Sequence, residues 1–434
     1  RYLNSSTSYV LYKGQTEQPY FVDKSQMLSE LFPFLDSGNT HICITRPRRF
    51  GKTVMANMIT AFLGKKQDSD SIFKSLKISQ NDLYNKYRNQ YNVISIDFSK
   101  MPRDCDSYTD YIDRIETNLI RDLRKEYPQI EIYEDDSAAD VLETIFEECD
   151  QQRFVFVLDE WDFIFHKDFV TEENKKQYVL FLSNLLKDRS YVQLTYMTGI
   201  LPIAKYSSGS ELNMFWEYTM ASEAKYNEYF GFTDSEVDQL YEKYTRNTRE
   251  IHISREDLKE WYYGYTTKSG ERMYNPRSVV LALTNNNIGN YWTSSGPYDE
   301  IFYYIRQNID DVQNDLALMI SGEAVTAKIQ GYAAVSMNLT TKNEIFSAMI
   351  VYGFLSYENG EVRIPNKELM NKFDDMIHKV SKLKAQKYNK KKWRYVQKQL
   401  KKSKKILYSN AATQKSINSA KSDLKKSINK LRRK

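Results

Sequence analysis

Short, mainly apolar runs alternate with longer amphipathic stretches through the first half of the chain. The runs predict five β-strands, at 42–45, 93–97, 154–158, 192–198 and 218–221. Apolar residues at helical spacing predict helices at 25–35, 52–63, 106–126, 138–149 and 172–188. Strands separated by helices favour a parallel sheet with right-handed crossovers, and the unbroken apolar run at 154–158 is typical of a strand covered on both faces. This half therefore predicts an α/β core.

The second half changes to a mainly helical pattern after Phe230-Gly-Phe232. Thr233-Asp-Ser-Glu236 predicts the cap of a helix that ends near Tyr244, and further helices are expected at 254–262 and from Pro276 onward. More helices then precede a hairpin at 353–364, with Asn359-Gly360 at its turn. The pattern fits a helical lid followed by a small winged-helix-like module.

A phosphate-binding P-loop is indicated where the first strand meets its helix. The segment 42–54 reads as a strand, a tight loop ending in Gly51-Lys-Thr53, and the start of a helix. Backbone N–H groups of such a loop converge on phosphates, and Gly51 lets the backbone approach them closely. Lys52 would reach the β- and γ-phosphates, and the Thr53 hydroxyl would bind Mg²⁺. The alternative is a chance Gly-Lys-Thr on a surface turn.

The loop departs from the usual pattern at its entry, where Arg46 stands in place of glycine. Pro47 pushes Arg46 towards an extended conformation and has no N–H to offer, so the loop must enter differently, with three arginines adding positive charge. We expect the nucleotide to be bound by Arg46, Pro47, Arg48, Arg49, Phe50, Gly51, Lys52, Thr53 and Val54.

An acidic pair at the end of the third strand predicts the second half of the site. In Phe154-Val-Phe-Val-Leu-Asp-Glu160 the apolar residues build the strand, and Asp159 follows at its carboxyl end. We expect this strand to neighbour the P-loop strand. Asp159 would bind Mg²⁺ through water, and Glu160 would act as the general base that polarises the attacking water. The alternative is an ordinary solvated strand end.

Two further polar residues near these strand ends are open to interpretation. Thr198 lies where a γ-phosphate sensor with a catalytic role would sit, or it simply caps the turn at Gly199. Asp162 is expected to be a solvated or helix-capping carboxylate.

The two halves together resemble the bacterial AAA-ATPase-like family, a STAND/AAA-type group of P-loop NTPases. The resemblance covers about 20–280 and depends on the following segments: Tyr20–Lys24, Ile44–Thr53, Val157–Asp162, Thr198–Ile200, Glu228–Thr233, Trp261–Tyr265 and Tyr274–Ser278. It implies an ATP-binding, Mg²⁺-dependent ATPase that acts as a conformational switch. ATP is expected rather than GTP because no guanine-reading motif is visible. Arg46 is the usual entry to the loop in this family.

The resemblance also suggests a nucleotide contact in the second half of the chain. Pro276 falls where related NTPases place a proline against the base or ribose; alternatively, it only starts a helix. Members often carry a PD-(D/E)-x-K nuclease-like domain at the C-terminus. Asp423 is the only acidic residue after Asp375, so we expect no nuclease activity in this chain. No arginine finger can be assigned, and a neighbouring subunit of a homo-oligomer could supply one.

Length and composition bound the domain organisation. At 434 residues the chain holds about two to three domains, and three separated cysteines indicate neither disulfides nor a zinc site. We expect a lead-in at 1–41, a P-loop NTPase core at 42–230, a helical lid at 231–312, the winged-helix-like module at 313–370 and a Lys-rich helical tail at 371–434. The sequence shows no membrane-length apolar run and no signal peptide, so we expect a cytoplasmic protein. It begins at Arg1 rather than Met, so its N-terminus could be incomplete.

The charge is divided unevenly along the chain. Residues 379–434 contain 21 Lys and Arg and one acid, a net +20, whereas 1–378 carries a net −15. A second function is therefore open: a protein that binds nucleic acid through this tail and uses nucleotide only as a switch. The tail could instead dock on the acidic body of this chain, contact an acidic partner or extend as a solvated segment. A third possibility is a scaffold that has lost turnover, against which the intact Lys52, Thr53, Asp159 and Glu160 argue.

Overall fold

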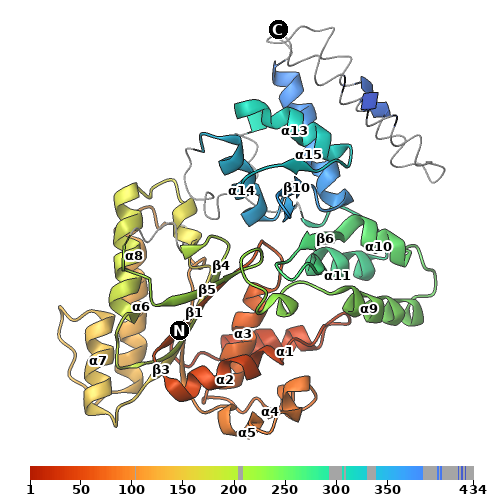
Figure 1. Cartoon of the computed structure of the whole chain (residues 1–434). Helices are drawn as coiled ribbons and strands as arrows, with labels where there is room; N and C mark the ends of the chain where they lie inside the picture. The colour runs from red at the N-terminus through yellow and green to blue at the C-terminus, as the bar shows by residue number, and fades with distance from the viewer. Residues whose placement is uncertain are drawn as a thin grey trace. The chain divides into compact units, whose positions relative to one another are not determined.

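The computed structural model divides into two units, Arg1–Phe232 (unit 1) and Thr233–Lys434 (unit 2) (Figure 1). The structure describes residues 1–102, 104–203, 209–292, 305–306, 309–329 and 339–384, and in the tail 398–399, 401–402, 419, 422–423 and 426. The finer division expected from the sequence, with a lid and a winged-helix-like module, stays a prediction. Most of the helical tail expected at 371–434 lies outside the described residues.

Unit 1 is built on a five-stranded parallel sheet, as the alternation of strands and helices predicted. Its strands are β1 (Thr40–Thr45), β2 (Asn92–Asp97), β3 (Phe154–Asp159), β4 (Val192–Gly199) and β5 (Phe215–Thr219). They pair in the order β2-β3-β4-β1-β5. The first four lie where the sequence predicted them; β5 begins and ends earlier than expected. Because the strands are parallel, their carboxyl ends meet at one edge.

The strand order corrects one expectation about the site. β3 was expected beside the P-loop strand β1, but β4 lies between them and pairs with both. An acidic pair at the end of β3 must therefore reach the loop across the end of β4, where Thr198 and Gly199 lie.

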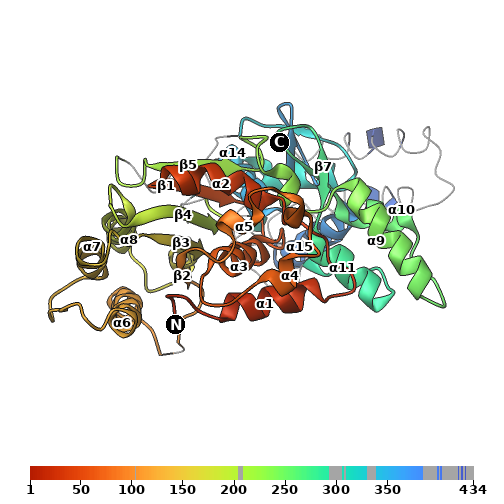
Figure 2. The ribbon, with the colours of Figure 1, turned by 90° about the horizontal axis from the view of Figure 1, so that it is seen from below.

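Helices cover both faces of this sheet (Figures 1 and 2). One apolar core lies against α1 (Thr7–Thr16), α2 (Met27–Ser37), α3 (Lys52–Leu63), α4 (Asp70–Phe73) and α5 (Tyr84–Tyr87). The other lies against α6 (Tyr108–Glu126), α7 (Ala138–Glu148) and α8 (Glu172–Leu186). Side chains of β3 alternate between the two, with Val155 and Val157 in the first core and Phe154, Phe156 and Leu158 in the second. The prediction that this strand is covered on both faces is confirmed.

Residues 1–41 are part of unit 1 rather than an appendage to it. Leu3 is fully buried and bridges Ile94 antiparallel on β2, and α1 places Tyr12 in the core. Helix α1 was not predicted, because two of its large apolar residues, Val10 and Leu11, are 61% and 50% exposed, so its pattern is weakly amphipathic.

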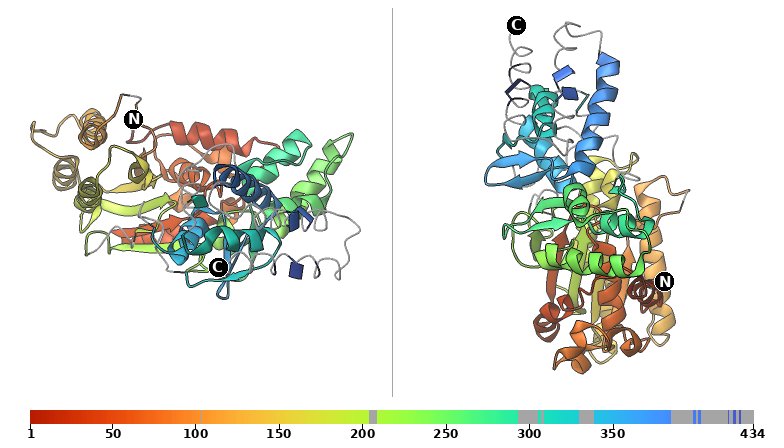
Figure 3. Two further views of the ribbon diagram at one scale, coloured as in Figure 1. Left: turned by 90° about the horizontal axis from the view of Figure 1, so that it is seen from above. Right: turned by 90° about the vertical axis from the view of Figure 1, so that its right-hand side faces the viewer.

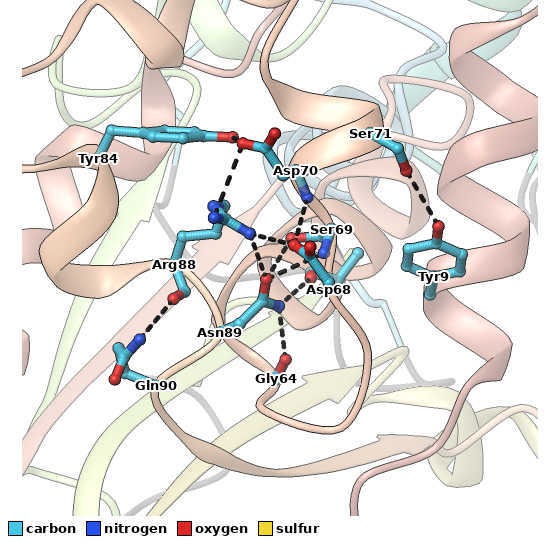
Figure 4. A network of polar contacts seen from close by, with 11 residues as sticks. Tyr9, Gly64, Asp68, Ser69, Asp70, Ser71, Tyr84, Arg88, Asn89 and Gln90 are labelled. Carbon is cyan, nitrogen blue, oxygen red and sulfur yellow. Dashed lines mark hydrogen bonds and ion pairs between the residues drawn. The ribbon is translucent and has the colours of Figure 1, made fainter.

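The connection from α3 to β2 is held by polar contacts (Figure 4). Asn89, with a positive φ of 58°, donates to the carbonyl of Gly64 at 2.7 Å, and its Oδ1 accepts from the backbone N–H of Ser69 at 2.9 Å. Arg88 pairs with Asp68 and lies 3.7 Å from Asp70. These contacts tie the end of the connection back to the end of α3.

The described part of unit 2 contains the predicted helices and two small sheets, coloured green to blue in Figure 3. Its elements are α9 (Asp234–Asn247), α10 (Arg255–Tyr262), β6 (Tyr263–Thr266), β7 (Arg272–Tyr274), α11 (Pro276–Asn285), α13 (Val312–Ile320), β8 (Val325–Thr326), α14 (Lys342–Tyr352), β9 (Ser356–Glu358), β10 (Glu361–Arg363) and α15 (Lys367–Lys384). The predicted hairpin is confirmed as β9–β10, and its turn residues Asn359 and Gly360 have φ of 50° and 84°, as a type I′ turn requires. Among the described residues, no helix is long and apolar enough to cross a membrane.

Candidate functional site

The P-loop leads from β1 to the first turn of α3. Gly51 caps the helix with φ of 87°, a left-handed conformation that glycine adopts without strain, and Arg49 also has a positive φ of 71°. A Cβ built on Gly51 would have no protein atom within 4 Å, so the space in front of this residue is open. The first N–H groups of α3 have no partner within the helix and point out of its N-terminus, which is where anions bind to helices.

Lys52 is buried within this loop, with a relative exposure of 5%. Its Nζ donates to the carbonyl oxygens of Arg46 and Pro47, both at 3.0 Å. Burial lowers the pKa of Lys52, while the carboxylates of Glu160 and Asp159 act to raise it. The loop thus holds an ammonium group close to two acidic residues, and among the described residues its hydrogen bonds go to backbone carbonyls.

Asp159 reaches Thr53 even though their strands are not adjacent. Asp159 is 5% exposed, and its carboxyl group lies close enough to the Thr53 side chain for the two to interact. Burial, and next the charge of Glu160, raise the pKa of Asp159 to about 7, and the interaction with Thr53 opposes this rise. The two residues expected to bind one Mg²⁺ therefore lie in contact.

Glu160 follows directly and adopts a strained backbone conformation, with φ of 53°. Its N–H donates to Asp159 Oδ1 at 3.0 Å. Burial raises the pKa of Glu160, and Lys52 is the strongest influence that lowers it. The strained turn therefore brings a second carboxyl group to the mouth of the loop, close enough to interact with Lys52.

The donors that the structure brings together suit magnesium. A hydroxyl and a carboxylate are hard oxygen ligands, and Mg²⁺ commonly uses one or two protein oxygens together with waters and substrate phosphates. Within the described part of the chain, no cluster of three or more His, Cys, Asp or Glu side chains could enclose a metal ion. Thr53 and Asp159 therefore fit a shared, phosphate-dependent Mg²⁺ better than a metal bound by protein alone.

Asp162 is not solvated, so that half of the expectation was wrong; it does stand at the N-cap position of the short turn Phe163–His166, but its side chain makes no capping hydrogen bond there. It is 1% exposed, and it accepts from the N–H groups of Ile200 at 3.2 Å and Leu201 at 3.0 Å. Burial alone would raise the pKa of Asp162, but His166 and these N–H donors outweigh it and lower the pKa. Its role is to tie the turn after β3 to the turn after β4. A Cβ on Gly199 would collide with this carboxylate, which explains the glycine there.

Thr198 is fully buried at the end of β4, and its hydroxyl donates to the carbonyl of Ile44 on β1 at 2.8 Å. The hydroxyl proton of Thr198 is therefore engaged in a hydrogen bond between β4 and β1. This contact is neither the turn cap nor a phosphate contact, so the γ-phosphate sensor and the turn-capping alternative both stay predictions.

The arginines of the loop have different surroundings. The Arg46 side chain is 1% exposed and turns to the sheet edge, where it donates to the carbonyl of Tyr218 and to Asn227 Oδ1, both at 2.9 Å. Burial lowers the pKa of Arg46 to about 9. Arg48 is half-buried and acts electrostatically on both Lys52 and Glu160. Arg48 is thus close enough to interact with Glu160, whereas the side chain of Arg46 points to the sheet edge and its backbone carbonyl faces Lys52.

The other predicted nucleotide contacts pack into the protein or lie elsewhere. Phe50 is 1% exposed, and Val54 packs on the core beneath α3. Pro276 lies in unit 2, where it is the first residue of α11 behind the capping Asn275. The helix-start reading of Pro276 is therefore observed, and its contact with the base stays a prediction.

Sequence reasoning missed the partners of Arg46. Tyr218 and Asn227 lie more than 170 positions away and join it through a backbone carbonyl and a lone amide. No spacing rule predicts such a contact. The only signal was an arginine before a proline, at a position where a phosphate loop usually has glycine.

Comparison with known proteins supports the resemblance seen in the sequence. Residues 12–208 match the AAA-ATPase-like family, described as predicted AAA-ATPases. The resemblance predicted from the motifs is confirmed over these residues. A curated relative, an uncharacterised protein from the vnfD 5′ region of Azotobacter chroococcum mcd 1, is 24% identical over 284 residues, which is 64% of this chain. The match covers 51% of that protein, so the chain spans about half the length of this curated relative.

Solved structures give weaker likenesses. A Walker-type ATPase of Pyrococcus abyssi aligns with a TM-score of 0.46 and 11% identity, over 81% of this chain and 95% of its own. The ORC2 protein of Aeropyrum pernix, solved as ADPNP–ADP complexes, aligns with a TM-score of 0.40 and 11% identity, over 82% and 93%. At TM-scores below 0.5 these likenesses carry no argument about this chain.

Proposed function

We propose that unit 1 binds ATP with Mg²⁺ at the P-loop and hydrolyses it, and that the chain uses this cycle as a conformational switch. The observation that carries the proposal is the contact of Asp159 with Thr53, beside the buried Lys52 and the carboxyl group of Glu160. These four residues come from two loops more than 100 positions apart. Nothing in ordinary packing requires a buried ammonium, a hydroxyl and two carboxyl groups to converge at the open start of a helix.

Each residue has a distinct task in this proposal. Lys52 exchanges its two backbone carbonyls for phosphate oxygens, which neutralise its charge better. Thr53 and Asp159 hold the metal, which would neutralise charge that develops on the phosphates. Glu160 accepts the proton of the attacking water, and its raised pKa makes it a stronger base than an exposed glutamate. Catalysis otherwise depends on positioning by the loop N–H groups.

The test is phosphate release measured beside nucleotide binding, on the full chain. Wild type should hydrolyse ATP slowly in the presence of Mg²⁺. Glu160→Gln should bind ATP within about threefold of wild-type affinity and lose at least about 100-fold in turnover, because it removes only the base. Lys52→Ala should lose binding itself.

Matched controls come from α8, where Glu173 and Lys176 are exposed. Glu173→Gln and Lys176→Ala make the same changes of charge and should behave as wild type. Binding without turnover in the wild type would leave a nucleotide-dependent scaffold in place of an ATPase. No binding of ATP at all would overturn the proposal.

A further inference from the structure

One segment of unit 1 is held by two cations from distant parts of the chain. The short helical turn Asn227–Tyr229 and the following Phe230 come just before the boundary at Phe232, after which the chain enters unit 2. Lys24 donates to the carbonyl of Glu228 at 2.5 Å, and Arg46 donates to Asn227 Oδ1 at 2.9 Å. We call residues 226–232 the junction.

Of these two contacts, the one made by Arg46 is the stronger, because Arg46 is buried. Its guanidinium lies 5.1 Å from the centre of the Phe230 ring, which is 1% exposed, in a cation–π contact. Asn227 is 5% exposed, and its Nδ2 has no hydrogen-bond partner among the described residues. The contact with Arg46 is therefore what fixes the orientation of this amide.

Arg46 is also held at its backbone. Lys52 donates to the carbonyl oxygens of Arg46 and Pro47, so the orientation of the Arg46 peptide depends on where the Lys52 ammonium lies. A phosphate in the loop would compete for that ammonium, since a charged acceptor binds it more strongly than a neutral carbonyl. Arg46 thus joins the phosphate site at its carbonyl and the junction at its guanidinium.

We propose that Arg46 couples the nucleotide state of the P-loop to the junction: phosphates that draw Lys52 away release the Arg46 peptide, and the hold on Asn227 and Phe230 loosens. This coupling rests on the proposed nucleotide binding. It gives a route by which the nucleotide state of the P-loop affects the junction. It also gives a role to the Glu228–Thr233 motif, which the phosphate site leaves unused. Coupling of this kind is reciprocal, so a change at the junction alters nucleotide affinity by the same factor.

Reciprocity gives a test at Asn227, outside the phosphate site. Asn227→Ala removes the Arg46 contact. It should tighten MgADP binding by about fivefold, because binding no longer has to weaken the hydrogen bond between Arg46 and Asn227. Asn227→Asp keeps the acceptor and adds a charge that holds the guanidinium more firmly, so it should weaken MgADP binding by a similar factor. Asn184→Ala, at an exposed position on α8, is the matched control and should equal wild type.

Hydrogen exchange of the junction amides is the second readout. In the wild type, MgADP should speed exchange of 226–232 by about fivefold, within the usual range of such couplings. In Asn227→Ala exchange should be fast with or without MgADP, and in Asn227→Asp it should be slow without it. A variant that is merely damaged would bind MgADP more weakly, which is the opposite of the result expected for Asn227→Ala.

Each outcome decides the question. Unchanged or weaker MgADP binding by a folded Asn227→Ala overturns the coupling, as does a junction in the wild type that MgADP leaves unchanged or protects. If Asn227→Ala does not fold, Asn227→Asp decides: weaker MgADP binding together with slower exchange of 226–232 without nucleotide supports the coupling, whereas weaker binding with faster exchange marks a damaged variant and overturns it. If the wild type binds no MgADP, the proposed function itself fails, and the coupling with it.

Discussion

Asp159 at the end of β3 lies close enough to Thr53 at the start of α3 to interact with it, across the end of the strand that separates them. The contact places a carboxyl group with a pKa of about 7 next to a hydroxyl, at a point where both would bind the same metal ion. Several expectations about binding and stability come from this arrangement and from the residues that support it.

Binding of MgADP should depend on pH through Asp159. The carboxylate must be deprotonated to hold Mg²⁺, and its pKa is raised to about 7, so affinity for MgADP should fall by about tenfold from pH 8 to pH 6. In Asp159→Asn this dependence should disappear, with affinity low at both values. Calorimetric titration at the two pH values measures this. Equal wild-type affinity at pH 6 and pH 8 would contradict it.

The same carboxyl group should destabilise the chain without nucleotide at high pH. Its pKa is higher in the folded than in the unfolded state, so the folded state binds more protons between pH 4 and 7 and loses stability as the pH rises through that range. Asp159→Asn should therefore raise the free energy of unfolding at pH 8 by about 2 kcal/mol, with a smaller gain at pH 5. Urea unfolding at both pH values is the measurement, and a destabilised variant at pH 8 would refute the reasoning.

Asp162 should be needed for folding rather than for chemistry. Asp162→Ala leaves the N–H groups of Ile200 and Leu201 without their acceptor and should cost about 2–4 kcal/mol in the free energy of unfolding. Because the pKa of this group is lowered in the folded state, the stability it contributes is lost as the pH falls. Asp168→Ala, at an exposed position, is the control. A solvated role would predict equal losses for both.

Gly199 should not tolerate even one added methyl group. A Cβ there would overlap Asp162 and Trp161, so Gly199→Ala should lower the free energy of unfolding by about 1–3 kcal/mol. Gly14→Ala is a suitable comparison, because Gly14 lies within α1 and its Cβ would meet nothing within 4 Å. That change should stabilise by up to about 1 kcal/mol. Thermal or urea melts of the pair decide whether packing at Gly199 is as tight as described.

The basic tail gives a test of the nucleic-acid alternative. A chain truncated after Lys384 keeps all of unit 1 and should retain MgATP binding and turnover. If the tail binds nucleic acid, the full chain should bind single-stranded DNA or RNA with an affinity that falls steeply with salt, and the truncation should lose that salt dependence. A salt slope unchanged by truncation would place any nucleic-acid binding elsewhere.

The sequence predicted the elements whose pattern is local. Strand β3 is an unbroken apolar run, α3 begins at the Gly-Lys-Thr signature, and the β9–β10 turn is marked by Asn359-Gly360. The candidate site residues in the phosphate loop could also be named from the sequence, because they lie within one short local motif. What was missed depends on distant partners: the burial of Asp162 follows from the turn after β4, and the side chain of Arg46 is directed by Asn227. The small β6–β7 hairpin was missed because its strands of four and three residues carry no clear alternation.

The antiparallel bridge between Leu3 and Ile94 has a practical consequence. It lays the first residues of the chain along the β2 side of the sheet, and Asn4 donates its N–H to the carbonyl of Val93 at 2.8 Å. An uncovered edge strand invites pairing with other molecules, so this short segment acts as a guard against aggregation. Changes that loosen residues 2–4 should therefore expose that side of the sheet to pairing with other molecules.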